Sequence, residues 1–247
     1  MNSSLPEPLR GRLSRGEWIR TAHRGAPKVA PGNTLRSILA ALAFGVDLVE
    51  IDVHRTPDGR LVLWHDDHIT SGLHRYAVDE VEFSTLHAAV KKSLGEELID
   101  LPQAIQAVAG KAGLMVDLKA DMLAGPIMDC AHAATDTPMV VCGDYRDALR
   151  EIRASGRSIG TSLTLDRSYR LRDGTLVPEQ FDTDAVTIAY QIAEGELIAR
   201  CHELGIAVLA WTVDDLPLMR RLLAADVDGL TSNRADLFAS VDEPPRS

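Results

Sequence analysis

The pattern of apolar residues along the chain predicts a (β/α)8 barrel, the TIM-barrel architecture, with a short insertion after the second strand. Short β-branched runs alternate with amphipathic stretches, their number suits eight strand–helix units in 247 residues, and no shift in composition marks a second domain. An open doubly wound sheet is the alternative fold, but no glycine-rich fingerprint follows the first apolar run. The expected strands cover residues 18–23, 47–53, 113–118, 138–142, 158–163, 184–188, 206–212 and 227–231.

The stretch 33–45 shows the kind of helix expected between these strands. Asn33 or Thr34 can cap its beginning, and Gly45 can end it. Its apolar residues recur at helical spacing: Leu35, Ile38, Leu39 and Leu42. Residues 214–229 repeat the scheme, with acidic residues first and arginines later, as the helix dipole favours.

One segment, residues 54–100, interrupts the alternation. Two apolar runs flank the sequence PDG at 57–59, and Asp-Gly between such runs predicts a β-hairpin. Because a hairpin reverses the chain, residues 60–65 are expected to lie beside the end of the second strand, with Asp52 roughly opposite His65. The rest of the segment is expected to form a lid or specificity element above the C-terminal rim of the barrel.

The bulk properties predict one domain over residues 17–240, with an extension over residues 1–16 and a tail over residues 241–247. A hydrophobic content of 45% suffices for a full core, and a formal charge of −10 argues against nucleic acid as a partner. The N-terminus lacks the apolar core of a signal peptide, and no stretch reaches the roughly 18 apolar residues of a membrane span. We therefore expect a cytoplasmic protein without stable membrane insertion. Its three cysteines predict no disulfide framework or zinc cluster and fit a reducing compartment: Cys130, Cys142 and Cys201.

Carboxylates share one face of two expected strands. Glu50 and Asp52 alternate with apolar residues, so both point to the same side, and burying them is costly unless a cation compensates their charge. Carboxylate oxygens are the ligands that Mg²⁺ and Ca²⁺ prefer. Asp117 and Lys119 repeat the pattern on another strand, where Asp117 would complete a site of three carboxylates. The alternatives are a solvated strand end and a simple Asp–Lys pair.

Two histidines, His23 and His65, each precede a charged residue at the end of an apolar run. A histidine in such a place is more often structural, but both are expected at the same rim as the carboxylates. Histidine is suited to proton exchange near neutral pH, so the pair could supply one base and one acid beside a phosphate. Four other histidines lack the spacing of a zinc site: His54, His68, His74 and His87. Three arginines could reach a phosphate, although a solvated loop is the favoured interpretation: Arg167, Arg170 and Arg172.

Five motifs occur in order along nearly the whole chain, and the set resembles the glycerophosphodiester phosphodiesterase family. They read AHRGAPKVAPGNT, GVDLVEIDVHRTPDGRLVLWHD, LMVDLK, VLAWTV and ADVDGLTSN. The resemblance implies a (β/α)8 barrel that hydrolyses glycerophosphodiesters to sn-glycerol 3-phosphate and an alcohol with a divalent metal. It also implies roles for single residues: His23 and His65 as catalytic, Glu50, Asp52 and Asp117 as metal ligands, Arg24 and Lys119 as phosphate-binding, and Trp211 in the pocket wall.

The chain departs from the family pattern at three places. Asp117 stands where the family usually has glutamate, so this shorter side chain reaches the metal either directly or through water. Gly32 replaces a glutamate in the first motif, and the closing motif reads TSNR at 231–234 rather than Thr-Asp before a proline. These departures bear on substrate choice and metal affinity more than on the class of reaction.

The expected mechanism is general acid–base cleavage of a small-molecule glycerophosphodiester with one Mg²⁺ or Ca²⁺, and with Mn²⁺ as a further candidate. Arg24 and Lys119 would neutralise the phosphate, while one histidine activates a hydroxyl and the other protonates the leaving alcohol. Attack by the neighbouring glycerol hydroxyl would give a cyclic phosphate first. Two alternatives remain: a phospholipase D-like or sphingomyelinase D-like lipid phosphodiesterase that releases a cyclic phosphate, and a non-catalytic phosphodiester-binding protein. Head group, order of the histidines and oligomeric state stay open at this point.

Overall fold

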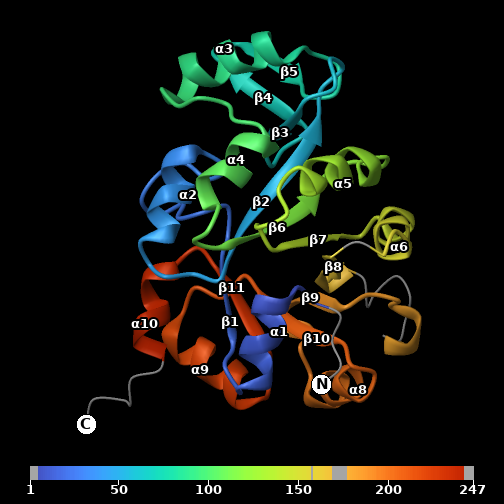
Figure 1. Cartoon of the computed structure of the whole chain (residues 1–247). Coiled ribbons are helices and arrows are strands. Elements are labelled where there is room, and N and C mark those ends of the chain that lie inside the picture. Colours follow the sequence, from blue (N-terminus) through green and yellow to red (C-terminus); the bar gives the residue numbers. More distant parts are fainter. Residues whose placement is uncertain (1–4, 157, 169–176, 242–247) are drawn as a thin grey trace.

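Eight parallel strands close into a barrel in the computed structural model, which describes residues 5–156, 158–168 and 177–241 (Figure 1). Strand β1 pairs with both β2 and β11, and this double pairing closes the sheet. Each barrel strand begins and ends within two residues of its expected range, so the predicted fold class is confirmed. The barrel strands are β1 (Ile19–Ala22), β2 (Leu48–Arg55), β6 (Gly113–Leu118), β7 (Met139–Gly143), β8 (Ile159–Leu165), β9 (Ala185–Ala189), β10 (Ala207–Trp211) and β11 (Gly229–Ser232).

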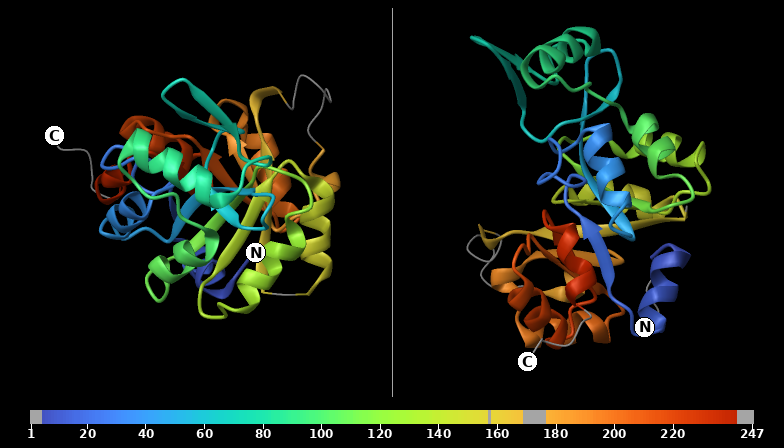
Figure 2. Two further views of the ribbon diagram at one scale, coloured as in Figure 1. Left: turned by 90° about the horizontal axis from the view of Figure 1, so that it is seen from above. Right: turned by 90° about the vertical axis from the view of Figure 1, so that its left-hand side faces the viewer.

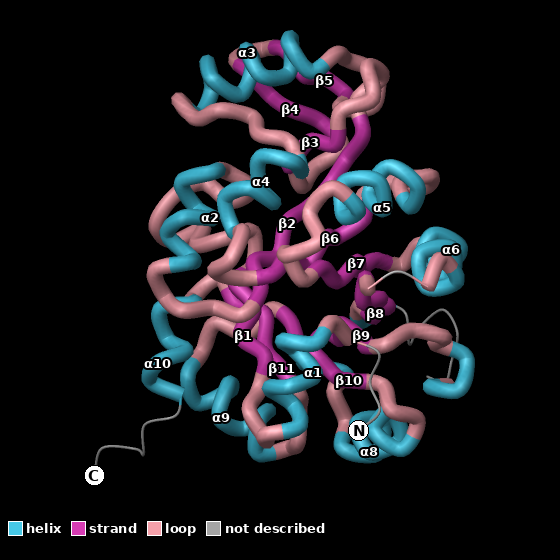
Figure 3. Tube along the Cα trace, viewed as in Figure 1, coloured by secondary structure: helices cyan, strands magenta, loops and turns pink. Residues whose placement is uncertain are grey.

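Helices cover the outer face of the barrel (Figure 3). The side chain of Thr34 accepts a hydrogen bond from the Ser37 N–H at the start of α2, and Asp100 does the same for Gln103 in α4. Of the two residues expected to cap α2, Thr34 is the cap. The helices are α1 (Glu7–Ser14), α2 (Leu35–Leu42), α3 (Phe83–Leu94), α4 (Leu101–Val108), α5 (Ala124–His132), α6 (Arg146–Ala154), α8 (Gly195–Glu203), α9 (Leu216–Ala224) and α10 (Phe238–Val241), with short 3₁₀ turns at Pro178–Gln180, Tyr190–Ile192 and Ala235–Leu237.

Apolar residues form one layer on each side of the barrel wall, because successive side chains of a strand point to opposite faces. On the outer side, Ile51 of β2 and Val116 of β6 belong to a large buried cluster with Ile38 of α2 and Leu149 of α6. On the inner side, a second buried cluster contains Ile19, Leu48, Met115, Val140, Cys142, Ala185, Ala207 and Leu209. The barrel interior is therefore a packed core and not a pore.

The N-terminal segment 5–14 fills the amino-terminal end of this interior, and we call it the N-terminal plug. Its Leu5 and Leu9 are each 2% exposed and belong to the inner cluster. Gly160 of β8 leaves room for the plug, since a Cβ at that position would lie 2.9 Å from Pro6 Cδ. The plug thus covers this end of the barrel and inserts Leu5 and Leu9 into it, while the domain boundaries expected after residues 16 and 240 stay predictions. Nearly all of the expected tail lies outside the described residues.

The hairpin expected after β2 is present, but its register differs from the expectation by one residue. Strand β3 (Leu61–Leu63) pairs antiparallel with β2, with Val53 opposite Leu63, so Asp52 faces Trp64 and not His65. The Trp64 N–H donates to the Asp52 carbonyl at 3.1 Å. The reason is the turn, which has three residues and carries Gly59 at a φ of 86°, whereas the expected register requires a two-residue turn.

The remainder of the insertion forms a small layer of its own beyond the end of β2. Strands β4 (His68–Ser71) and β5 (His74–Ala77) make an antiparallel hairpin that extends away from the barrel (Figure 2). The hairpin and α3 share a separate apolar cluster that includes Ile69, Val78 and Leu86. Among the described helices, none combines the length and the hydropathy needed to cross a bilayer.

Candidate active site

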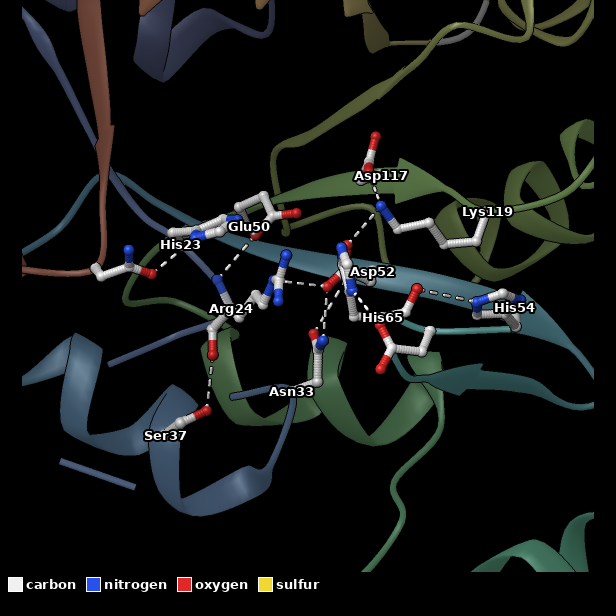
Figure 4. A network of polar contacts seen from close by, with 12 residues as sticks. His23, Arg24, Asn33, Ser37, Glu50, Asp52, His54, His65, Asp117 and Lys119 are labelled. Carbon is white, nitrogen blue, oxygen red and sulfur yellow. Dashed lines mark hydrogen bonds and ion pairs between the residues drawn. The ribbon is translucent and has the colours of Figure 1, made fainter. Parts of the chain in front are cut away.

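Carboxylates from two adjacent strands meet inside the C-terminal end of the barrel (Figure 4). Asp52 of β2 and Asp117 of β6 are register partners, and Glu50 lies one inward-facing position below Asp52. Glu50 is 5% exposed and Asp52 is 1% exposed. The Lys119 Nζ lies 2.8 Å from Asp52 Oδ1 and 2.5 Å from Asp117 Oδ2, so this ammonium bridges the two aspartates.

Asp52 is held from its other side as well. Asn33 Nδ2 donates to Asp52 Oδ2 at 2.7 Å, and Asn33 Oδ1 accepts the Asp52 N–H at 3.1 Å. Arg24 Nε lies 3.0 Å from the same Oδ2. Burial works against the charge of Asp52, but Lys119 and Arg24 hold the pKa of this carboxyl below its ordinary value. Asp52 is therefore ionised. The sequence analysis considered Asn33 only as a helix cap and missed its contacts with Asp52.

The other two carboxylates experience the opposite balance. Burial, followed by the charges of Asp52 and Asp117, raises the pKa of Glu50 well above its ordinary value. Burial also raises the pKa of Asp117, although Lys119 opposes the change. Glu50 Oε2 accepts the Arg24 backbone N–H at 2.8 Å. The site thus contains more acid than its two cations neutralise, which is the condition that an added cation relieves.

Glu50, Asp52 and Asp117 could hold a metal ion, because one oxygen from each lies within 4.8 Å of the others. Three carboxylate oxygens form the donor set that Mg²⁺ and Ca²⁺ prefer. Within the described ranges, none of the four discounted histidines joins such a cluster. Of the three arginines weighed as phosphate ligands, Arg167 is exposed, and Arg170 and Arg172 lie outside the described residues.

His23 follows β1 directly and lies at the Glu50 end of the site (Figure 4). Its Nδ1 is 2.8 Å from Asn233 Oδ1, and its Nε2 is 3.9 Å from Glu50 Oε2. Burial, and then the neighbouring Arg24 charge, lowers the pKa of His23, so the ring is neutral near pH 7 and its contact with Glu50 is not an ion pair. Arg24 has a φ of 55°, a tight bend that directs both its N–H and its guanidinium back to the carboxylates.

His65 follows β3 and approaches the site from the insertion. Its side chain is 44% exposed, and its Nδ1 is 2.7 Å from Asp66 Oδ1. Its backbone carbonyl is 3.4 Å from Nε2 of the buried His54, and this contact links the segment after β3 to β2. The structure therefore gives the two histidines different settings: His23 is enclosed, whereas His65 lies at the mouth.

All of the expected site residues line one cavity of about 290 Å³. Trp211 forms part of its wall and donates from Nε1 to the Thr187 carbonyl at 3.0 Å. Sequence reasoning missed Tyr145, whose hydroxyl donates to the Lys119 carbonyl at 3.2 Å. It also missed Cys142, whose buried thiol donates to Asp117 Oδ1 at 3.6 Å. Cys142 lies near the C-terminal end of β7 and Tyr145 just beyond it, and these positions alone could have indicated that both lie near the site.

A closed barrel with acids, cations and two histidines gathered at the C-terminal ends of its strands has the arrangement of a barrel enzyme, whose active site lies at that end. The glycerophosphoryl diester phosphodiesterase family model matches residues 23–136 and 127–237, and the chain belongs to this family of phosphoric diester hydrolases.

Relatives match over most of their length. The chain is 28% identical over 251 residues to a probable glycerophosphodiester phosphodiesterase 2 of Mycobacterium tuberculosis, covering 93% of this chain and 92% of the relative. It is 25% identical to a glycerophosphodiester phosphodiesterase of Caldanaerobacter subterraneus, covering 86% and 92%. An Oleispira antarctica phosphodiesterase solved in complex with its product sn-glycerol-3-phosphate has a TM-score of 0.78 at 23% identity, covering 91% and 97%. These matches agree with the predicted family.

Proposed function

We propose that the chain hydrolyses glycerophosphodiesters to sn-glycerol 3-phosphate and an alcohol by two-histidine general acid–base catalysis with one divalent cation. The observation that carries the proposal is the single cavity shared by His23, His65, the three carboxylates and the cations Arg24 and Lys119. A binding site alone would not need two proton carriers. The small-molecule substrate fits a cavity of about 290 Å³.

Arg24 and Lys119 would bind the phosphate. Both contact Asp52 and line the cavity, and each has further N–H groups besides the one that faces Asp52. Hydrogen bonds from a guanidinium or an ammonium to a phosphate are among the strong ones, so a phosphate oxygen beside these two side chains would be bound favourably. Trp211 would form the apolar wall beside the substrate.

Glu50, Asp52 and Asp117 would hold the cation, Mg²⁺ or Ca²⁺ with Mn²⁺ as a further candidate. When bound, the cation supplies positive charge to a phosphoryl oxygen. Its charge would also relieve the repulsion that raises the pKa of Glu50 and Asp117.

The two histidines would divide the proton transfers. One removes the proton from the attacking oxygen, either water or the neighbouring glycerol hydroxyl, and the other protonates the oxygen of the leaving alcohol. Attack by the internal hydroxyl gives a cyclic phosphate, which water then opens with the histidine roles exchanged. Both rings line the cavity, so each can reach a substrate bound there.

Turnover of glycerophosphocholine, glycerophosphoethanolamine and glycerophosphoglycerol, with Mg²⁺, Ca²⁺ and Mn²⁺ in turn, tests the proposal. Phosphorus NMR of the products should show sn-glycerol 3-phosphate, and H23A or H65A should lower kcat by about 10² or more without loss of fold. A cyclic phosphate as the end product would favour the lipid phosphodiesterase alternative, and binding without turnover would favour a binding protein. Activity that persists in both variants would refute the histidine roles.

A further inference from the structure

A chain of hydrogen bonds runs behind His23, away from the cavity. Asn233 Oδ1 lies 2.8 Å from His23 Nδ1, and Asn233 Nδ2 donates to Asp214 Oδ2 at 2.7 Å. The Asn233 backbone N–H donates to the other oxygen, Asp214 Oδ1, at 2.8 Å, and the Ser232 hydroxyl donates to this oxygen at 3.0 Å. Asp214 therefore holds Asn233 by its main chain and its side chain at once.

The barrel itself brings these groups together. Ala22 and Ser232 are register partners of β1 and β11, and the His23 N–H donates to the Ser232 carbonyl at 2.9 Å. The next residue of each strand end, His23 and Asn233, must then lie side by side. Asp214 reaches the same place from the segment that follows β10. Closure of the barrel is thus what completes the chain of hydrogen bonds.

The Asp214 carboxylate determines which group donates in each of these hydrogen bonds. A carboxylate only accepts hydrogen bonds, so the Asn233 group that faces Asp214 must be the NH₂, and the group that faces His23 must be the oxygen. That oxygen can only accept, so the Nδ1 of His23 must carry the proton. In the neutral ring the lone pair then belongs to Nε2, the nitrogen that faces Glu50 and the cavity.

We propose that Asp214 and Asn233 are positioning residues, which hold His23 in the Nδ1–H tautomer and direct the Nε2 lone pair into the cavity. Asp214 and Asn233 are not among the described residues that line the cavity, so both act through the His23 ring. The kinetic consequence rests on the proposed function, and it makes Nε2 the His23 nitrogen that exchanges a proton with the substrate.

Asp214→Asn exchanges the donor and acceptor roles in the hydrogen bonds that join residue 214, Asn233 and His23. The Asn233 N–H and the Ser232 hydroxyl both donate to the Oδ1 position, so the new amide places its oxygen there and its NH₂ toward Asn233. Asn233 must then rotate its amide, and it presents a donor to His23 Nδ1. The ring responds by moving its proton to Nε2. Loss of such supporting contacts typically costs about 10- to 100-fold in activity, and we expect this fall in kcat with KM nearly unchanged.

The double variant D214N/N233D restores the original direction. The new amide at position 214 donates from its NH₂ to the carboxylate at position 233, which accepts the His23 Nδ1 proton as the wild-type oxygen does. We expect kcat to recover most of the loss seen in D214N. Asp215→Asn is the matched control, because it removes the same charge from the neighbouring residue. Its carboxylate caps α9 through the Leu218 N–H, a role that asparagine also fills, so wild-type kcat is expected.

Nitrogen-15 NMR of the histidine rings tests the tautomer without reference to turnover. The signal assigned to His23 by its loss in H23Q should show a protonated Nδ1 in the wild type and in D214N/N233D, and a protonated Nε2 in D214N. Circular dichroism confirms that each variant is folded. The proposal is overturned if the neutral His23 ring of the wild type carries its proton on Nε2, or if D214N retains the wild-type kcat. It is also overturned if D214N/N233D is no more active than D214N. A wild type that hydrolyses no glycerophosphodiester refutes the proposed function but leaves the NMR result decisive for the tautomer.

Discussion

Replacing Glu50 with glutamine separates the charge of this residue from its shape. Glu50 is buried, and burial together with the charges of Asp52 and Asp117 raises its pKa. In E50Q the amide oxygen can still accept the Arg24 N–H, which is 2.8 Å from the carboxylate in the wild type. The variant therefore removes one negative charge and one candidate cation ligand with little change in packing.

The size of the effect follows from the spacing of the acids. Their nearest ligand oxygens lie within 4.8 Å of one another. At an effective dielectric constant of about 20, two unit charges at that separation repel by about 3.5 kcal/mol. Lys119 bridges Asp52 and Asp117 and offsets part of this repulsion. We expect E50Q to raise the free energy of unfolding of the cation-free protein by about 2 kcal/mol near pH 8, which corresponds to a rise in Tm of about 4–8 °C.

The pH dependence has a definite sign. An unfolded glutamate releases its proton near pH 4.3, whereas the buried Glu50 keeps its proton to a higher pH because its folded-state pKa is raised. The folded state then binds more protons than the unfolded state, so stability of the cation-free wild type falls as pH rises from about 4 through the folded-state pKa. E50Q should lack this part of the fall.

The assay is the Tm of chelator-treated protein, measured by circular dichroism at acidic and alkaline pH, without cation and with excess Mg²⁺ or Ca²⁺. A cation that binds the folded state raises the wild-type Tm by mass action, and E50Q should lose most of this rise. Glu196→Gln, on the exposed first turn of α8, is the control that removes an equal charge elsewhere. The reasoning is refuted if E50Q melts below the wild type, or if the cation raises both melting temperatures equally.

Three further predictions concern other parts of the barrel. The hydrogen bond to Asp228 raises the pKa of His202. The contribution of this bond to stability is therefore present below about pH 6.5 and is lost as pH rises through the raised pKa. H202Q should flatten the dependence of Tm on pH in that range. Leu9→Ala should lower the free energy of unfolding by about 2–5 kcal/mol in urea titrations, because this plug residue is 2% exposed. An equal stability for wild type and L9A would contradict the packed interior. Gly32→Ala should raise KM with a smaller change in kcat, since a Cβ at Gly32 would lie 3.0 Å from the Cβ of Arg24 and displace the guanidinium that we propose binds the phosphate. Steady-state kinetics with an unchanged KM would count against this prediction.

The sequence predicted the barrel and the placement of the acids well, because both depend on local periodicity. Alternation within β2 was sufficient to place Glu50 and Asp52 on one face, and the position of Asp117 near a strand end placed it at the same rim. The hairpin register was off by one residue, since Asp-Gly is compatible with turns of two or three residues.

Other features could not be predicted because they depend on contacts between distant segments. Asn33 has the signature of a helix cap, and only the folded chain shows it clamping Asp52. The link between Asp214, Asn233 and His23 requires the first and last strands to be adjacent. Arg24 and Lys119 were expected to face a phosphate, and the pairing of both with Asp52 is visible only in three dimensions.

The N-terminal plug has a consequence for how the protein is made. Leu5 and Leu9 are synthesised before every barrel strand, but the inner cluster that they join includes residues as late as Leu209. At a synthesis rate of about 5–20 residues per second, these leucines wait roughly 10–40 s for their last partners. Such a contact has a long sequence separation, which slows folding and leaves apolar surface open to chaperones in the interval. A segment made before the barrel strands is thus among the last to be buried, so a protein fused to it would be tethered to the part of the barrel that closes late.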